Sequence, residues 1–294
     1  MRFPIDGIEI APTIPPMQRS DYHTHTPLCR HAEGTPERFV AAALSQGLSD
    51  YGIADHAPMP PDLEPYDEWR MLCSELPEYL EWINQARRTA SGTPLRILSG
   101  LECDWVPGIE PWIGELRRRY KWDYLIGSVH YLRARDSVDD ALYADRSITG
   151  DVEEDWRLYW QAITDMIKSG LFDIVGHIDL VKIWGRVPKG DLMRYYAPAL
   201  EALEASSGMA VEINTAGLYK RCAEQYPAIP LLRELLRRRI PIVINSDAHH
   251  PEHLSRDWTR ATDLLRELCD NKLCQMNIPL KHSPEISLHA YGSL

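Results

Sequence analysis

Two pairs of residues in this chain have the side-chain types and the spacing that bind a metal ion. His23 and His25 lie two residues apart near the start of the chain, and Asp247 and His249 lie two residues apart near its end. Residues two apart on an extended strand project from the same face, so each pair can chelate one ion. Imidazole together with carboxylate suits zinc, manganese or iron. The pairs therefore predict a metal centre, provided that the fold brings both ends of the chain together.

Further polar side chains of similar chemistry follow the apolar runs between these two pairs. In chain order they are His31, Asp55, His56, Glu102, His130, His177, Asp179 and Asn214. A single histidine or acid at the end of a strand is more often a capping, hydrogen-bonding or salt-bridging residue than a ligand. The joint pattern favours a metal site, because seven of the 11 histidines lie at or just after predicted strands.

The elements that must position these side chains are short strands that alternate with helices. The predicted strands are 20–25, 49–54, 96–101, 123–129, 172–176, 209–214 and 241–246. The predicted helices are 36–46, 68–89, 111–119, 152–169, 192–205, 230–238 and 255–269. Such alternation indicates parallel strands joined by right-handed crossovers. An open doubly wound sheet would also alternate, but no glycine-rich phosphate loop follows the first strand, and polar residues close nearly every strand. A closed or nearly closed α/β barrel gathers such strand ends on one face.

Length and composition agree with one globular barrel domain. The 294 residues suit a single domain over 18–294, preceded by a proline-rich extended arm at 1–17. A net charge of −11 disfavours nucleic acid as a general partner. We expect no membrane span, because no apolar run approaches about 20 residues. The start lacks an apolar signal segment, and the six cysteines are scattered, so we expect reduced thiols and a cytoplasmic protein.

Seven stretches together resemble one known family. They are "DYHTHTPLCRH", "ADHAPMP", "GLECDW", "GSVHYL", "GHIDLVK", "EINTAGLYK" and "NSDAHHPE". Their order and spacing resemble the PHP (polymerase and histidinol phosphatase) superfamily, and most of all its monofunctional histidinol-phosphatase branch. The resemblance extends from about residue 19 to about residue 270, which is nearly the whole chain.

The resemblance implies a distorted seven-stranded (β/α)7 TIM-like barrel, with the active site at the C-terminal ends of the strands. It also implies three divalent metal ions, which would be zinc, manganese or iron. Carried over by motif, the ligands of the first ion would be His23, His25, Glu102 and Asp247. Those of the second would be the bridging Glu102 with His130 and His177. Those of the third would be His31, His56 and His249.

The implied activity is hydrolysis of a small phosphate monoester, with L-histidinol phosphate as the expected substrate in histidine biosynthesis. Clustered divalent ions would supply a bridging hydroxide for in-line attack and would neutralise the phosphoryl oxygens. Glu102, Asp247 and His249 would take part in catalysis as members of this centre. Asp179 and Asp55 are candidates for proton donation or for orienting a ligand, and a helix cap fits Asp179 at least as well.

The sequence departs from the branch at one position that bears on the substrate. The branch has Arg-Lys after its "NT-small-Gly-Leu" motif, whereas this chain has Tyr219-Lys220. Tyrosine cannot replace the charge or the fork of a guanidinium. The candidates for phosphate binding are Lys220, Arg221, Lys182 and Asn214. The loop "PMPPDLEPYDEWR" offers Asp62, Glu64, Tyr66 and Trp69 to the organic part of the substrate, although a purely structural loop fits it too.

The sequence is also compatible with three other functions. Tyr219 favours a PHP phosphoesterase that acts on a different small phosphate ester. A metal-dependent amidohydrolase or deaminase also begins with HxH and ends with Asp, but it commonly bridges its metals with lysine and has no counterpart of His31 with His56. A non-catalytic metal-binding protein would use the same ligands. The sequence does not predict the oligomeric state.

Overall fold

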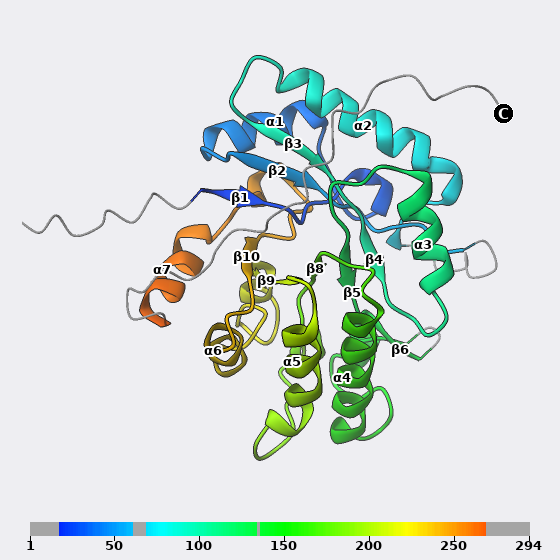
Figure 1. Ribbon diagram of the computed structural model, residues 1–294, viewed down its shortest axis with the longest axis vertical. Coiled ribbons are helices and arrows are strands. Elements are labelled where there is room, and N and C mark those ends of the chain that lie inside the picture. Colours follow the sequence, from blue (N-terminus) through cyan, green and yellow to red (C-terminus); the bar gives the residue numbers. More distant parts are fainter. Residues whose placement is uncertain (1–17, 61–68, 134–135, 269–294) are drawn as a thin grey trace, which may run out of the picture.

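The protein is described here by a computed structural model, which covers residues 18–60, 69–133 and 136–268. The predicted arm at 1–17 and the candidates Asp62, Glu64 and Tyr66 lie outside the described residues. Within the described part, helices surround a ring of short parallel strands (Figure 1). This is the predicted α/β barrel.

Eight strands occupy the seven positions of the ring. They are β1 (Ser20–Asp21), β2 (Asp50–Ile53), β3 (Arg96–Ser99), β4 (Glu102–Asp104), β5 (Ile126–Ser128), β8 (Ile174–Val175), β9 (Ala210–Asn214) and β10 (Ile242–Asn245). The positions number seven because β3 and β4 follow each other at one position. The hairpin β6 (Tyr131–Arg133) and β7 (Asp136–Ser137) lies outside the ring sheets. The helices are α1 (Pro36–Ser45), α2 (Leu76–Thr89), α3 (Glu110–Arg119), α4 (Val152–Ser169), α5 (Met193–Ala205), α6 (Ile229–Arg237) and α7 (Trp258–Leu268).

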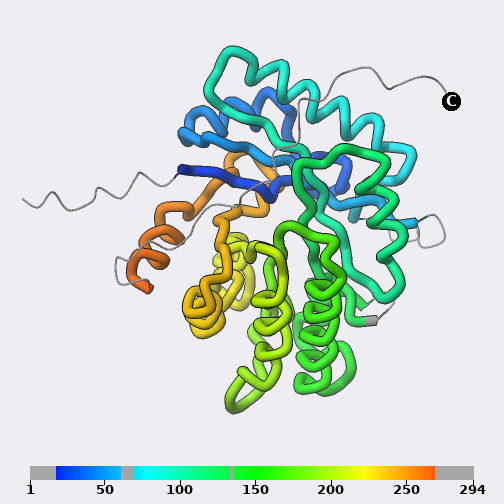
Figure 2. Tube along the Cα trace, viewed as in Figure 1, coloured from blue at the N-terminus to red at the C-terminus, as the bar shows by residue number. Residues whose placement is uncertain are grey.

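The ring consists of two parallel sheets, β1-β2-β3 and β10-β9-β8-β5-β4, joined at two places. At the first, one chain segment leaves β3 and enters β4 in the other sheet. At the second, the backbone beyond β1 meets the backbone beyond β10: the His25 amide donates to the Ala248 carbonyl at 2.9 Å, and the Ala248 amide donates to the His23 carbonyl at 3.2 Å. The first and last predicted strands are therefore neighbours, and Figure 2 shows β1 and β10 side by side.

Local signals set both ends of α1. The Thr35 side chain accepts from the Arg38 amide at 3.3 Å, and Pro36 opens α1 as predicted. Gly47, with φ of 69°, takes the left-handed conformation after the helix. The predicted start of α2 at residue 68 was wrong. Glu75 instead accepts from the Leu72 amide at 2.7 Å and closes a short 3-10 turn, after which α2 begins at Leu76.

The barrel interior changes from apolar to polar towards the C-terminal ends of the strands. One core cluster, which includes Ala210 and Val243, fills the part of the barrel further from the C-terminal ends of the strands. On β9, Glu212 and Asn214 follow Ala210 on the same inward face, because alternate residues share a face. On β10, Asn245 follows Val243 in the same way. The polar site therefore rests on a packed apolar layer.

Gly100 lies at the corner between β3 and β4. The predicted strand 96–101 covers β3, and β4 begins just beyond it. A Cβ at this position would lie 2.6 Å from the ring of Tyr124. That ring is buried, and its hydroxyl donates to the Tyr22 carbonyl at 2.5 Å, so it has little freedom to move away. Close packing at this corner therefore requires glycine.

We expect Gly100→Ala to lower the free energy of unfolding by about 1–3 kcal/mol, because it overpacks a filled core. Gly114→Ala is a matched control, since a Cβ there meets nothing within 4 Å and the residue lies inside helix α3. It should instead stabilise the protein by about 0.5–1 kcal/mol. Urea denaturation measures both changes, and equal stability of the two variants would contradict this account of the corner.

Two other expectations concern the chain as a whole. No helix in the described part combines the length and the apolar character that a membrane span needs. Cys29, Cys103 and Cys222 form no disulfide with one another, in agreement with the predicted thiols, while Cys269 and Cys274 lie outside the described residues.

Candidate metal centre

Glu102, the first residue of β4, lies at the middle of the candidate site. Its Oε1 atom is 3.0 Å from Nε2 of His177 and 3.7 Å from Nε2 of His130. Its Oε2 atom is 3.3 Å from Nε2 of His23 and 3.7 Å from Nε2 of His25. Each carboxylate oxygen therefore faces a different pair of histidines, which is the arrangement that a bridging carboxylate needs.

Asp247 completes the group around His23 and His25. Its Oδ1 atom is 3.0 Å from Nε2 of His25 and 3.8 Å from Nε2 of His23. Asp247 follows β10 with φ of 53°, a left-handed backbone that aspartate tolerates better than most residues. The contacts between the backbones beyond β1 and β10 bring this carboxylate to the first histidine pair.

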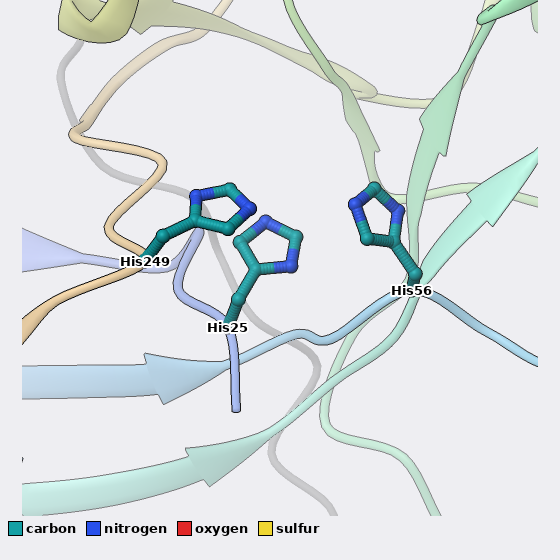
Figure 3. Close-up of side chains that lie close together, drawn as sticks. All are labelled: His25, His56 and His249. Atoms are coloured by element: carbon teal, nitrogen blue, oxygen red, sulfur yellow. The ribbon is translucent and has the colours of Figure 1, made fainter. Parts of the chain in front are cut away.

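The three remaining predicted ligands lie beside this group. His31 and His249 face each other with their Nε2 atoms 2.8 Å apart. The ring of His249 stacks on that of His25 at 4.0 Å, and Figure 3 shows His56 facing these two rings from the far side. His56 also approaches Glu102, with 3.0 Å between its Nδ1 and Oε2. The structure therefore joins all nine predicted ligands in one cluster, in which His56 lies between the predicted groups.

The chemistry of this cluster fits divalent metal ions. Among the described residues, Nε2 of His23 and Oε2 of Glu102 are buried without a hydrogen-bond partner, although they lie close to each other. Buried polar atoms of this kind are costly unless an ion or water meets them. Burial alone would raise the pKa of Glu102, but His23 and His56 hold that pKa well below its usual range. The cluster thus offers an ionised carboxylate among imidazoles.

Two of the predicted ligands of the third ion, His31 and His249, are imidazoles whose pKa is lowered, which favours the neutral form. Burial and the neighbouring His56 and His25 lower the pKa of His31 to about 4. Burial and His25 also lower the pKa of His249 well below its usual range. Neutral imidazole is the form that donates a lone pair to a metal.

Carboxylates contact the Nδ1 atoms of several of these histidines, and most of them were not predicted from the sequence. Glu212 accepts from Nδ1 of His23 at 3.0 Å, and Asp104 accepts from Nδ1 of His130 at 2.5 Å. Asp55, expected as a donor or orienting group, lies 3.2 Å from Nδ1 of His25. Glu212 and Asp104 could have been found from the sequence, because each stands two residues from a polar site residue on its own strand.

The structure does not bring Asp179 and Lys182 into the cluster. Lys182 is only 3% exposed, and its Nζ lies 3.0 Å from Oδ2 of Asp179 and 2.9 Å from Oε2 of Glu224. Asp179 also accepts from the Ala228 amide at 2.8 Å. The two residues tie the loops after β8 and β9 together, so the geometry does not favour the expected catalytic and phosphate-binding roles.

The other predicted phosphate-binding residues have mixed positions. The side-chain amide of Asn214 donates to Asp247 at 3.1 Å and to Glu212 at 2.9 Å, so it supports the cluster directly. Arg221 is exposed and pairs with Asp145 at 2.7 Å. Lys220 is exposed on the same loop.

Two aromatic side chains that the sequence singled out, Tyr219 and Trp69, are exposed. Tyr219 is 60% exposed, and the guanidinium of Arg256 lies over its ring, 4.0 Å from the ring centroid. A guanidinium therefore lies at this loop although residue 219 is not arginine. Trp69 is 58% exposed, and its ring lies 5.4 Å from that of His31 in an edge-on arrangement. It is the described member of the loop predicted to contact substrate.

Known proteins are similar in sequence to this chain over most of its length. The sequence profile of the family described as PHP domain matches residues 21–216. A Deinococcus radiodurans protein named probable histidinol-phosphatase is 40% identical over 85% of this chain and 92% of its own length. The histidinol-phosphatase of Bacillus subtilis is 31% identical over 79% of this chain and 94% of its own.

Solved structures support the fold. A Listeria monocytogenes structure aligns with a TM-score of 0.75 at 24% identity, over 82% of this chain and 99% of its own. A histidinol phosphate phosphatase of Lactococcus lactis, complexed with zinc, L-histidinol and phosphate, aligns with a TM-score of 0.66 at 24% identity, over 85% and 94% of the two chains. The family profile and the 40% identity together settle membership: this chain belongs to the PHP domain family.

Proposed function

We propose that this chain is a metal-dependent phosphomonoesterase that hydrolyses L-histidinol phosphate to L-histidinol and phosphate. The observation that carries the proposal is the position of Glu102, whose two oxygens face two different pairs of histidines. The relatives at 40% and 31% identity bear the histidinol-phosphatase name, which supports the substrate. We further propose three bound divalent ions, held by the nine residues named above, with zinc as the first metal to test.

The chain's own residues have separate tasks in this reaction. Glu102 joins the two histidine groups, and the Ser128 hydroxyl fixes its orientation by donating to Oε1 at 2.7 Å. Asn214 holds Asp247 towards His25. Divalent ions, when bound, supply Lewis acidity: they acidify water towards neutral pH and offset the charge of phosphoryl oxygens. The ring of strand ends keeps the ligands in fixed positions, so little reorganisation precedes reaction.

A substrate panel with phosphate release as the readout tests this proposal. The expected result is a kcat/KM for L-histidinol phosphate at least about 10²-fold above that for p-nitrophenyl phosphate, since a site built for a polar substrate discriminates strongly. The panel should include sugar phosphates, nucleoside monophosphates and amino-alcohol phosphates. Turnover of L-histidinol phosphate no faster than p-nitrophenyl phosphate would refute the substrate assignment.

A second candidate is a PHP phosphoesterase with another small substrate. Tyr219 favours it, because the branch has arginine at that position and the expected substitute Lys182 is engaged with Asp179. The same panel separates the two candidates, since the second predicts that a different ester on the panel is hydrolysed fastest.

Trp69 gives a prediction about the organic half of the substrate. Its exposed indole beside His31 can stack on an imidazole ring, and such contacts are worth about 0.5–1.5 kcal/mol. We therefore expect Trp69→Ala to raise KM for L-histidinol phosphate by about twofold to tenfold, while Trp69→Phe keeps most of the affinity. Ethanolamine phosphate, which has no ring, serves as the control substrate. An equal rise in KM for both substrates would contradict a stacking role.

A further inference from the structure

Two histidine pairs in the metal centre differ in the groups that face the Nδ1 atoms of their rings. We call His23 and His25 the inner pair, and His31 and His249 the outer pair. Nδ1 of each inner histidine faces a buried carboxylate, that of Glu212 at 3.0 Å and that of Asp55 at 3.2 Å. Nδ1 of each outer histidine faces a main-chain carbonyl, that of Cys29 at 2.7 Å for His31 and that of Asp247 at 3.0 Å for His249.

Glu212 is held in place by several donors besides His23. It accepts from the side-chain amides of Asn214 at 2.9 Å and Asn245 at 2.7 Å, and from the His177 amide at 2.7 Å. The carboxylate is fully buried. All these donors are neutral, so its charge is directed at His23 and is not shared with a lysine or arginine. A carboxylate so fixed holds the proton on Nδ1 and leaves Nε2 of His23 as the ligand atom.

Asp55 supports His25 in a similar way. Its carboxylate is fully buried and accepts from the His56 amide at 2.8 Å and from the Thr26 amide at 3.1 Å. The Thr26 hydroxyl donates to it as well. The inner pair therefore has two rigid negative charges behind it, in addition to Glu102 and Asp247 in front.

The outer pair has weaker support and is also less buried. The carbonyl oxygens that orient the rings of His31 and His249 carry no net charge. The carboxylate of Asp247 lies 3.6 Å from Nδ1 of His249, but it already faces His25 at 3.0 Å. The His249 side chain is 23% exposed, whereas both inner side chains are fully buried. An ion held by this pair would therefore have less compensating charge and a shorter path to solvent.

We propose that the metal held by the inner pair is retained much more tightly than the metal held by the outer pair, and that Glu212 is a positioning residue that sets this difference. Carboxylates behind metal-bound histidines make the imidazole a better ligand, and losing one typically costs about 10–100-fold in metal affinity. The outer position is then the first to exchange as free zinc falls. This inference rests on the proposed metal centre, but it does not depend on which ester is the substrate.

Equilibrium dialysis of the full chain against buffered free zinc tests the proposal, with bound zinc per chain counted by mass spectrometry. The wild type should lose zinc in separate steps. His31→Ala should remove the weakest step and leave the midpoint of the tightest step unchanged. Glu212→Gln should move the tightest step to about 10–100-fold higher free zinc and leave the weakest step unmoved.

Asp155→Asn is a matched control, because Asp155 is a buried carboxylate that accepts from the Ile148 and Thr149 amides at 2.8 Å, away from the cluster. It should shift neither step. A single common midpoint in the wild type would overturn the proposal, and that measurement needs no variant to fold. So would a Glu212→Gln protein that melts at a lower temperature yet keeps the wild-type zinc midpoint. Complete absence of zinc binding would overturn the proposed metal centre itself.

Discussion

Replacing Glu102 with alanine is expected to reduce phosphate release by about 10²–10³-fold or more, the loss seen when one preorganised electrostatic contact is removed. The reason is its position: one oxygen faces His23 and His25, and the other faces His177 and His130. Without the carboxylate, the two histidine groups lose their shared anionic ligand. Bound metal per chain should fall together with activity, measured on the same sample by mass spectrometry and by phosphate release.

Glu102→Gln sharpens this experiment because it preserves size and removes charge. It should be nearly as inactive as the alanine variant, since an amide is a poor bridging ligand. Asp155→Asn provides the control for loss of a buried carboxylate elsewhere, and it should keep a wild-type kcat. Circular dichroism checks that each variant is folded. Near-wild-type turnover in folded Glu102→Ala would refute the proposed role of Glu102.

Removal of metal by a chelator is expected to abolish phosphate release and to lower the melting temperature by about 5 °C or more. The second effect follows because a ligand present at about 100 times its Kd stabilises the folded state by about 2.7 kcal/mol, which corresponds to several degrees for a protein of this size. Adding back zinc, manganese or iron separately should restore both properties. The metal that restores the highest kcat identifies the preferred ion.

The control for metal removal is a sample treated with chelator already saturated with zinc. It should keep its activity, which excludes direct inhibition by the chelator. Full activity in protein containing less than about 0.1 metal ion per chain would rule out a metal-dependent reaction.

Much of the fold could be predicted because its local signals agree with its packing. Seven runs of apolar residues ending in polar ones match the seven strand positions, and Thr35-Pro36 with Gly47 mark α1. The separate strand β4 was not predicted, because the corner at Gly100 involves packing against the ring of Tyr124, which is distant in the sequence. The start of α2 was misplaced because Glu75 caps a separate turn, a contact that helix periodicity does not reveal.

The site was predictable where the spacing itself sets the geometry, as in His23 with His25. Asp247 and His249 have the same spacing, but Asp247 has a positive φ, and the two side chains face His25 and His31 respectively. Long-range pairing decided the rest. Lys182 resembled a phosphate-binding cation in the sequence, but its ammonium is held by Asp179 and Glu224. Glu212 lies inside an apolar strand and was not predicted as a site residue, although it is two residues before Asn214 on the same inward face of β9.

Crystals of active, zinc-loaded protein, measured at wavelengths on either side of the zinc absorption edge, test the central claim most directly. We expect two anomalous peaks beside Glu102, each about 2.0–2.2 Å from one of its two carboxylate oxygens. One peak should also contact His23, His25 and Asp247. The other peak should also contact His130 and His177. A further peak should lie between His31 and His249. Crystals of fully active enzyme with no anomalous peak in contact with Glu102 would contradict it.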